Sequence, residues 1–533
     1  MQPGPATESK PRSTIIGGSN DPDRLLRGRK VGFAPILVDL NDLNSYKLIR
    51  RVLKSGNPKR LEPLRNGNPR NFNWRIGLNL HTAIGQRIVM KNQKLLASLL
   101  VLAFAFVFLG APEIGLAQNW TQFRGSNSNG HAEASSLPHE FGEEKNLKWK
   151  TSISGRAWSS PVIDGDEVWL TTAIEVEATG EDKIRMMKKA KIGGMSAFSR
   201  VRLKAICVSR KTGKIIHEKQ LFDVNEPPLI NTLNSFASPT PAIDREHVYC
   251  NFGAFGTVCL KREDGSIVWK NQDYKIDHQT GPGSSPLLYQ GKLYLNFDGI
   301  DKQFLVALNA KDGKEIWKQD RSGQLNPRPD FKKAFTTPVV VRIDEKEQLI
   351  SPGADWVYGY APDTGKELWK VKFGERFGFS NAPQPVVSDK RVFVCTGFMR
   401  SVLLAIDLKE GKPDGEGVAW KYRQQVPCMP TPIVVDKRIY FVSDRGIATC
   451  LDVTDKSVKW QKRLGGDYSA SPIFADGKLF FSDRRGSVFV LKPGDEFELL
   501  SENKLDSRVM ATPAAAGNSL FIRTEKSLYH FGK

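Results

Sequence analysis

Short runs of alternating apolar and polar residues, separated by tight turns, recur from residue 146 to the end of the chain. In residues 286–295 two such runs flank a Gln-Gly turn, and in residues 472–481 they flank an Asp-Gly turn. Alternation with a period of two is typical of half-buried strands, and Asp-Gly between two runs indicates a β-hairpin. The pattern therefore predicts antiparallel β structure built from short strands.

A small polar residue followed by proline opens each pair of runs. The dipeptides lie at residues 160–161, 240–241, 285–286, 337–338, 384–385, 431–432, 471–472 and 512–513. A third run and a second turn follow, and then a run that carries tryptophan, as in residues 305–317 and 357–369. Trp269, Trp420 and Trp460 hold the same place in their repeats, and His217 replaces tryptophan in the first.

Four short strands every 40–50 residues or so is the period of a β-propeller blade. We therefore predict an all-β fold, an eight-bladed β-propeller of four-stranded antiparallel blades. Seven blades is the alternative, because residues 498–501 form a weak fourth strand. The run at residues 146–150 resembles a fourth strand that precedes the first repeat. It is predicted to pair with the last blade, so that an N-terminal strand closes the ring and removes an open sheet edge.

The turns at residues 311–317 and 363–369 resemble the PQQ (pyrrolo-quinoline quinone) repeats. In both turns glycine stands four residues before tryptophan and is followed by lysine. Such PQQ-like repeats form the β-propellers of quinoprotein dehydrogenases and of bacterial outer-membrane assembly lipoproteins. The resemblance covers about residues 146–533. The opening residues 119–125 look like the start of a group of secreted bacterial PQQ-like repeat proteins.

The resemblance to quinoprotein dehydrogenases implies PQQ on the propeller axis, a calcium ion held by Glu, Asn and Asp, and a disulfide of adjacent cysteines. The chain has six cysteines, none adjacent to another. No Glu, Asn and Asp of this chain can be matched, residue by residue, to the calcium ligands of that family. We therefore predict no cofactor, and keep PQQ with calcium as the alternative. The lipoproteins carry cysteine directly after signal cleavage, whereas this chain has Gln118 there. No lipid anchor is predicted.

Residues 90–117 have the layout of a secretory signal peptide: Lys91 and Lys94, then an apolar stretch over residues 95–111, then small residues at 115 and 117. An uncleaved membrane anchor is the alternative. In residues 1–89 apolar residues do not recur with the period of a strand (2 residues) or of a helix (3.6 residues) over any sustained stretch. We interpret them as a non-native extension upstream of a true start at Met90, or as a disordered basic tail. Residues 118–145 form the mature N-terminal segment, and residues 146–533 the propeller.

The formal charge of +20 suggests nucleic-acid binding until its distribution is considered. Residues 1–89 carry 16 Lys and Arg against 6 Asp and Glu, and residues 118–533 carry 60 against 51. Half of the excess therefore lies in the N-terminal extension. Export and this modest charge argue against a nucleic-acid partner.

The cysteines and turn aspartates are read as structural. Cys207, Cys259 and Cys450 align with small residues of other blades on the third strand, a packed position. A disulfide between Cys250 and Cys259 across a hairpin stays an open alternative. Their spacing does not suit zinc, and no metal site is predicted. Asp298, Asp444 and Asp483 are interpreted as turn residues.

Loops just before each pre-proline residue are expected to surround one mouth of the central channel. Basic and aromatic residues there are the candidate ligand- or partner-binding residues: Arg156, Trp158, His278, Lys333, Arg376, Asn381, Tyr468 and Arg508. An insertion in blade one, residues 173–202, is predicted to carry a short amphipathic helix that overhangs the same mouth as a lid or docking arm, or packs on the rim. No catalytic residues are predicted.

The sequence thus predicts an exported, non-catalytic β-propeller scaffold, periplasmic or extracellular and monomeric. It would bind a protein partner of the envelope, or a small anionic or sugar ligand, at the channel mouth. The alternative is a PQQ-dependent dehydrogenase of alcohols or sugars.

Overall fold

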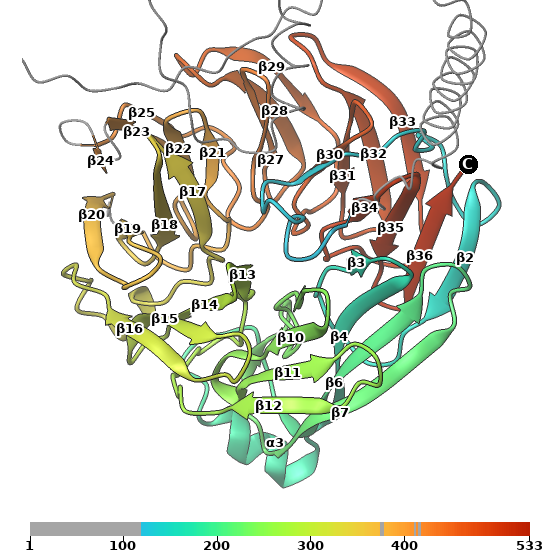
Figure 1. Cartoon of the computed structure of the whole chain (residues 1–533), viewed down its shortest axis with the longest axis vertical. Coiled ribbons are helices and arrows are strands. Elements are labelled where there is room, and N and C mark those ends of the chain that lie inside the picture. Colours follow the sequence, from blue (N-terminus) through green and yellow to red (C-terminus); the bar gives the residue numbers. More distant parts are fainter. Residues whose placement is uncertain (1–118, 374–377, 410–411, 414–416) are drawn as a thin grey trace, which may run out of the picture. The chain divides into compact units, whose positions relative to one another are not determined.

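Eight four-stranded antiparallel sheets surround a central axis in the computed structural model (Figure 1). The structure describes residues 119–373, 378–409, 412–413 and 417–533. The predicted extension 1–89, the predicted signal peptide 90–117 and Arg376 lie outside these residues. The predicted eight-bladed propeller is confirmed, and seven blades is excluded because Glu498–Lys504 forms a regular fourth strand, β33, in blade seven.

The strands run outward from the axis in chain order within blades one to seven. The innermost strands are β3 (Val162–Asp164), β9 (Ala242–Ile243), β13 (Leu287–Tyr289), β17 (Val339–Ile343), β21 (Val386–Ser388), β26 (Ile433–Val435), β30 (Ile473–Ala475) and β34 (Ala514–Ala516). The second strands are β4 (Glu167–Glu177), β10 (His247–Asn251), β14 (Lys292–Asp298), β18 (Lys346–Pro352), β22 (Arg391–Cys395), β27 (Arg438–Val442), β31 (Lys478–Ser482) and β35 (Ser519–Arg523).

The third strands are buried and the fourth strands are amphipathic. The third strands are β6 (Phe198–Ser209), β11 (Thr257–Lys261), β15 (Gln303–Asn309), β19 (Trp356–Tyr360), β23 (Leu403–Lys409), β28 (Ile447–Asp452), β32 (Ser487–Lys492) and β36 (Ser527–Gly532). The fourth are β7 (Ile215–Asn225), β12 (Ile267–Asn271), β16 (Glu315–Asp320), β20 (Glu367–Lys372), β25 (Trp420–Tyr422), β29 (Val458–Arg463), β33 (Glu498–Lys504) and β2 (Leu147–Ser152). The short β24 (Lys412–Pro413) also pairs with β23.

The last blade combines both parts of the chain. Its order is β34, β35, β36 and then β2, and β2 pairs antiparallel with β36 from Leu147 opposite Phe531 to Ser152 opposite Ser527. The N-terminal strand therefore closes the ring, as the sequence predicts, and protects an edge that would otherwise be open.

Three of the repeat tryptophans, Trp269, Trp317 and Trp460, hydrogen-bond to the next blade, whereas Trp369 donates to Gln348 Oε1 of its own blade. Trp269 stands opposite Cys259 and donates its indole N–H to Ala310 O of the next blade at 2.9 Å. Trp317 stands opposite Ala307 and donates to Pro362 O at 2.9 Å. The small residue on the third strand leaves room for the indole, which explains the column of small residues in the sequence.

The cysteines follow this scheme. Cys207, Cys259 and Cys450 occupy the predicted column opposite His217, Trp269 and Trp460. The disulfide left open for Cys250 is not formed, and both thiols are free. Cys259 stands opposite Tyr249, whereas Cys250 stands opposite Val258, so the two side chains leave opposite faces of the sheet.

Residues 119–132, here called the crossing segment, span the far end of the central channel; part of this stretch is the cyan trace near the axis in Figure 1. Trp120 bridges Ile163 of blade one, and Thr121 O accepts from the N–H of Ile243 of blade two at 2.8 Å. On the opposite side β1 (His131–Ala132) runs parallel to β30. The crossing segment therefore ties blades that lie across the ring from one another.

Buried Arg124 anchors the middle of this segment. Its guanidinium donates to Pro432 O at 3.0 Å and to Pro472 O at 3.3 Å. Burial lowers the pKa of this guanidinium to about 9. Two carbonyls at the starts of β26 and β30 thus hold the crossing segment against blades six and seven.

The blade-one insertion is narrower than predicted. Strands β4 and β6 pair as far as Glu177 opposite Phe198, so much of residues 173–202 extends the blade itself. Between them lie α3 (Gly180–Met187) and β5 (Met195–Ser196), which pairs with β8 (Ile230–Asn231). The helix is real but shorter than the patterned stretch 181–195. Short 3-10 turns occur at Gly253–Phe255 (η1) and Pro329–Phe331 (η2).

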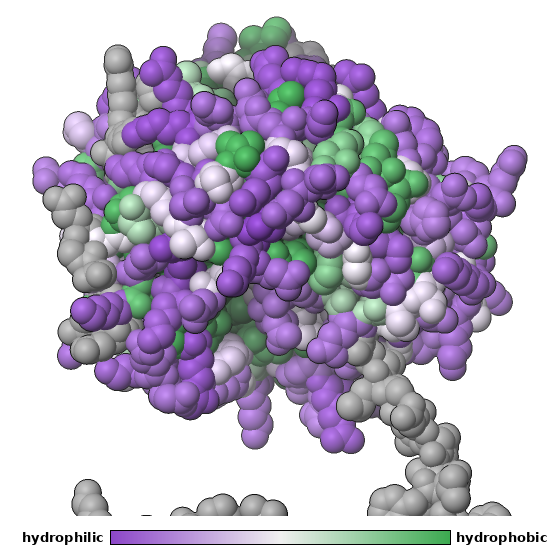
Figure 2. Space-filling model, turned by 90° about the horizontal axis from the view of Figure 1, so that it is seen from above, coloured by the Kyte–Doolittle hydropathy of each residue, from purple (hydrophilic) through white to green (hydrophobic). Residues whose placement is uncertain are grey.

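Viewed from its edge, the propeller shows mostly hydrophilic side chains, with hydrophobic ones in small patches (Figure 2). Exposed aliphatic residues of the outer strands include Ile316, Leu368 and Val458. Within the described ranges, no helix has both the length and the apolar character needed to cross a membrane.

Candidate functional site

A cavity of about 630 Å³ opens on the face where each outer strand connects to the next inner strand. The pre-proline residues form its deeper tier. Seven of the eight line it: Ser160, Thr240, Ser285, Thr337, Thr431, Ser471 and Thr512. Phe123 of the crossing segment also lines the cavity. Since that segment spans the far end of the channel, the cavity is a well with one open end.

The deeper tier is a ring of hydrogen bonds from blade to blade. The backbone N–H of Thr240 donates to Ser285 Oγ at 3.0 Å, and that of Ser285 to Thr337 Oγ1 at 3.0 Å. The same bond joins Ser160 to Thr240, Gln384 to Thr431, Thr431 to Ser471 and Ser471 to Thr512. Each of these hydroxyls accepts from protein and keeps its own hydrogen for a ligand or water.

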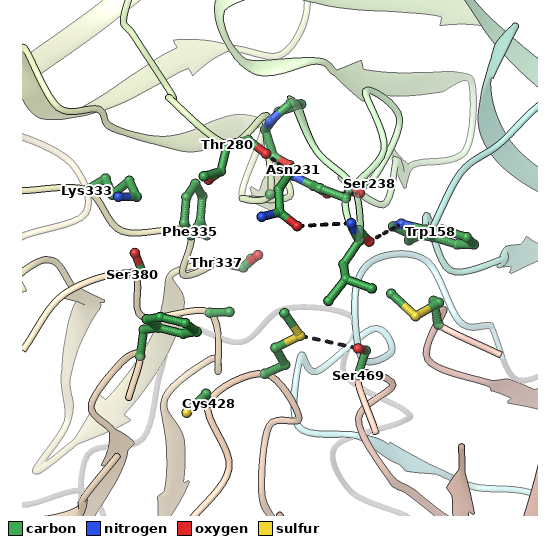
Figure 3. A pocket seen from close by; sticks show the side chains of 18 of the residues that line it. Trp158, Asn231, Ser238, Thr280, Lys333, Phe335, Thr337, Ser380, Cys428 and Ser469 are labelled. Carbon is green, nitrogen blue, oxygen red and sulfur yellow. Dashed lines mark hydrogen bonds between the residues drawn. The ribbon is translucent and has the colours of Figure 1, made fainter. Parts of the chain in front are cut away.

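The residue two positions before each pre-proline residue forms the upper tier. All eight line the cavity: Trp158, Ser238, Gly283, Phe335, Ala382, Met429, Ser469 and Met510. In extended backbone, residues i and i−2 face the same way, so both tiers point toward the axis. Figure 3 shows Trp158, Phe335 and Ser469 approaching from different blades.

Aromatic residues dominate one side of the mouth. Phe331 stacks on Phe379 with ring centroids 4.3 Å apart, and Phe379 meets Phe398 edge-on at 6.4 Å. Phe398 remains 53% exposed and its neighbour Met399 63%. Large apolar side chains this exposed at the rim of a pocket are typical of a contact surface.

On the opposite side, Leu233 is held at the rim by its backbone. Its N–H donates to Asn231 Oδ1 at 3.0 Å, and its carbonyl accepts from the Trp158 indole at 2.9 Å (Figure 3). The Leu233 side chain is left 38% exposed above the cavity. Ile192 and Gly193, which follow α3, continue this wall.

Lys333 is the buried cation of the cavity. Its residue is only 5% exposed, and its ammonium donates to Gln279 Oε1 at 2.5 Å and to Asp330 O at 2.7 Å. Burial lowers its pKa to about 8. The loop is fixed from blade five, because Ser380 N–H donates to Lys333 O at 2.7 Å. The ammonium lies 5.5 Å from the Phe379 ring.

Of the eight candidate residues, the structure brings Trp158 and Lys333 to the cavity. Arg508 lies near Trp158, with its guanidinium 5.8 Å from that ring, and pairs with Glu525 at 2.7 Å. Arg156 pairs with Glu175 at 2.9 Å beside strand β4. Both arginines are therefore neutralised by carboxylates.

The other candidates hold loops in place. Asn381 is fully buried and donates to Gly353 O at 2.6 Å while accepting from Gly397 N–H at 2.5 Å. Tyr468 packs in the core between blades six and seven. His278 accepts from Ala254 N–H at 3.0 Å, and burial lowers its pKa to about 4. Arg376 is not among the described residues.

Sequence reasoning missed the apolar lining, including Phe379, Phe398, Met429 and Met510. It sought charged and aromatic groups as chemical signals. The sequence did hold a signal for these residues. The residue two positions before each pre-proline residue recurs once per repeat, so this column could have been predicted to line the channel mouth. Cys428 also lines the cavity, in a loop whose N–H groups at 428 and 429 donate to Asp444. Asp444 therefore positions cavity residues as well as its own turn.

The donor set does not match a calcium-bound quinone site. Among the described residues, no three His, Cys, Asp or Glu side chains gather closely enough to hold a metal ion. The charged residues that line the cavity are Arg328, Asp330 and Lys333. We therefore derive no reaction step through a quinone.

Comparison with known proteins gives one family. A family model described as outer membrane protein assembly factor BamB matches residues 193–462 and 301–532. BamB of Yersinia pestis is 22% identical over 246 residues, 44% of this chain and 57% of that protein. A quinohemoprotein alcohol dehydrogenase of Pseudomonas putida is 27% identical over 131 residues, 22% of this chain and 17% of that protein. These matches therefore span little more than half, and about a sixth, of the two curated relatives.

Among solved structures, a europium-containing methanol dehydrogenase aligns with a TM-score of 0.57 at 10% identity. The alignment covers 78% of this chain and 98% of that one. At this identity the likeness concerns the fold alone, because one propeller scaffold hosts many functions.

Proposed function

Because the chain belongs to the BamB-like family of PQQ-repeat propellers, we propose that it is a non-catalytic binding scaffold of the bacterial envelope. The binding site is the cavity at the channel mouth, and its occupant is part of a protein partner. The family description names assembly of outer membrane proteins, which supports an envelope role.

The observation that carries this proposal is the form of the cavity. It is open at one end, floored by Phe123, and walled by apolar side chains above a ring of hydroxyls. A concave apolar site with a few fixed polar groups is the usual form of a binding pocket. Apolar side chains also continue outside it, at Leu233, Phe398 and Met399. A sugar or small anion would leave this rim uncovered, which favours a protein.

The test is capture of a partner from envelope extract, with the cavity filled in one variant. Ala382→Trp places an indole in the upper tier. Leu499→Trp on the outer strand β33, where Leu499 is 45% exposed, is the matched control. We expect Ala382→Trp to lose a partner that the unaltered protein and the control both retain. Equal recovery by all three proteins would reject the cavity as the binding site.

The competing function is a PQQ-dependent dehydrogenase, suggested by the short match to the quinohemoprotein enzyme. We propose that no cofactor is used, since the cavity lacks a carboxylate cluster for calcium. Addition of PQQ and Ca²⁺ should leave the absorbance of the purified protein equal to the sum of its components. A shifted quinone band with dye-linked alcohol oxidation would establish the enzyme instead.

We further propose export to the periplasm or extracellular space and a monomeric state. A ring closed by β2 within one chain exposes no terminal blade that a second copy must cover. Sedimentation of the purified protein as a single monomeric species would agree with this, and a concentration-independent dimer would not.

A further inference from the structure

We infer that the cavity receives a peptide segment in which a large apolar side chain lies beside a carboxylate. The inference rests on the proposed function and narrows the chemistry of the partner. It follows from three features of the mouth: an apolar well, a buried cation, and an exposed apolar rim.

The well suits one or two large apolar side chains. Phe335, Met429 and Met510 project from three different blades into the upper tier, and Phe123 lies below them. Methionine side chains are flexible and polarisable, so they adapt to different apolar shapes. Such a wall can accept large apolar side chains of different shapes, rather than a single ligand of one shape.

Lys333 supplies a cation beside this well. An ammonium has three hydrogens to donate, and its two partners, Gln279 Oε1 and Asp330 O, are uncharged oxygens. The Asp330 carboxylate is engaged elsewhere, with Oδ1 accepting from Gln279 at 2.5 Å and Oδ2 lying 3.9 Å from Arg328. The charges of Asp330 and Asp277 also act on Lys333 and favour its protonated form. Because only uncharged oxygens accept from the ammonium, its third hydrogen is left for a carboxylate from the occupant.

The other cations near the mouth do not offer this. Arg156 and Arg508 are paired with Glu175 and Glu525. Arg484 is engaged with Ser469 Oγ at 2.7 Å and with the Met429 sulfur at 3.2 Å. Arg328 also lines the cavity, but its side chain is exposed and lies 3.9 Å from the Asp330 carboxylate. Lys333 is thus the buried cation of the cavity lining.

The rim favours a peptide over a free carboxylate. Phe398 and Met399 on blade five and Leu233 before blade two are exposed on different sides of the mouth. An occupant that fills only the well would leave them in water. A polypeptide crossing the mouth would cover them while one side chain enters the well, and buried apolar area of this kind is the main source of affinity.

The test uses dye-labelled hexapeptides and the purified full chain, with binding read from fluorescence anisotropy. One peptide carries central Phe-Asp, and its controls carry Phe-Asn and Ala-Asp. A fourth ends in Phe with a free carboxylate and a fifth ends in Phe amide, which separates a side-chain carboxylate from a terminal one. Unlabelled 3-phenylpropanoate serves as the small-molecule competitor.

We expect loss of the carboxylate to weaken binding about tenfold or more, since a charge-assisted hydrogen bond in a buried site contributes this much. Loss of the ring should weaken binding to a similar extent. Lys333→Met should remove the preference for Asp over Asn. Lys302→Met, an exposed lysine on the 299–302 turn of the same face, should keep it. Circular dichroism and thermal melting check that both variants fold.

Equal affinity of the unaltered protein for the Phe-Asp and Phe-Asn peptides would overturn the inference, and no variant is needed for that comparison. Competition by 3-phenylpropanoate at the affinity of the peptides would also overturn it, in favour of a small carboxylate. If no peptide binds while Ala382→Trp abolishes partner capture, the inference fails and the proposed function stands. If Ala382→Trp leaves capture unchanged, the proposed function itself fails.

Discussion

The serine or threonine before each proline has two roles that the repeat pattern alone does not distinguish. Its side chain accepts a hydrogen bond from the preceding blade, and the same hydroxyl lines the cavity. Ser160 departs from this scheme, since its buried Oγ has no partner. Gln384 is a second exception, with an unpartnered Oε1. The ring of pre-proline side chains is therefore not uniformly hydrogen-bonded, and its members should differ in their contribution to the free energy of unfolding.

Ser471→Ala and Ser160→Ala test this difference as a matched pair. Ser471→Ala leaves the buried N–H of Thr431 without an acceptor, so the free energy of unfolding should fall by about 1–3 kcal/mol. Ser160→Ala removes no hydrogen bond and should change it by less than about 0.5 kcal/mol. Urea denaturation followed by tryptophan fluorescence measures both. Equal losses would show that the hydroxyl bonds do not join the blades.

His278 makes stability depend on pH. Burial lowers its pKa to about 4 in the folded protein, against about 6.5 in the unfolded chain. The unfolded chain therefore binds a proton first as the pH falls, so the unfolding free energy should decline between about pH 6.5 and pH 4. Asp301 is the charged group that opposes this shift. His530, whose pKa is also lowered to about 4, adds to the same decline.

Denaturation of the unaltered protein and His278→Gln at pH 7 and pH 4.5 measures this contribution. Glutamine can still accept from Ala254 N–H but does not titrate. The variant should lose less stability on acidification, by roughly 1–3 kcal/mol. An identical loss in both proteins would mean that His278 is not the responsible group.

At the scale of the element, the sequence predicts most of what is seen. The alternating runs, the Asp-Gly turns and the repeated tryptophans correctly located the four strands of each blade. The continuation of β4 and β6 through Glu177 and Phe198 was missed, because residues 173–177 and 198–202 continue the strand pattern without a turn to mark where an insertion begins. Strand lengths are set by pairing with a partner strand, which local pattern does not reveal.

The turn glycine of one blade packs against the tryptophan of the blade before it. A Cβ at Gly313 would lie 2.5 Å from the Trp269 ring, and one at Gly365 would lie 2.6 Å from Trp317. This close approach explains why glycine precedes lysine in the repeated turn. Docking of blade on blade therefore depends on glycine as well as on tryptophan.

Gly313→Ala and Gly291→Ala separate this contact from backbone strain. Both glycines have positive φ, +71° and +72°, but a Cβ at Gly291 meets nothing within 4 Å. Both variants share the strain of that conformation, whereas Gly313→Ala also displaces Trp269. Its unfolding free energy should fall by about 1–3 kcal/mol more than that of Gly291→Ala. Urea denaturation and the melting temperature measure the effect, and equal destabilisation would argue against docking.

At the scale of the whole molecule, periodicity predicted eight blades and the strand that closes the ring. It did not predict that residues 119–132 block one end of the channel, because their contacts with Ile163, Pro432 and Phe474 come from distant repeats. The sequence indicated the face that carries the cavity but not which candidate residues line it. Trp158 and Lys333 line the cavity, while Asn381 and Tyr468 are buried supports, and burial depends on packing that a loop sequence does not encode.

The central claim is that the channel mouth binds a protein partner. A photo-crosslinking amino acid at Phe398, on the mouth, tests it in intact cells, with the same substitution at Leu499 on the outer strand as the control. The account predicts a discrete crosslinked protein from position 398 that is absent from position 499 and is lost when Ala382→Trp fills the cavity. Crosslinking from position 499 alone, or from 398 irrespective of Ala382→Trp, would contradict it.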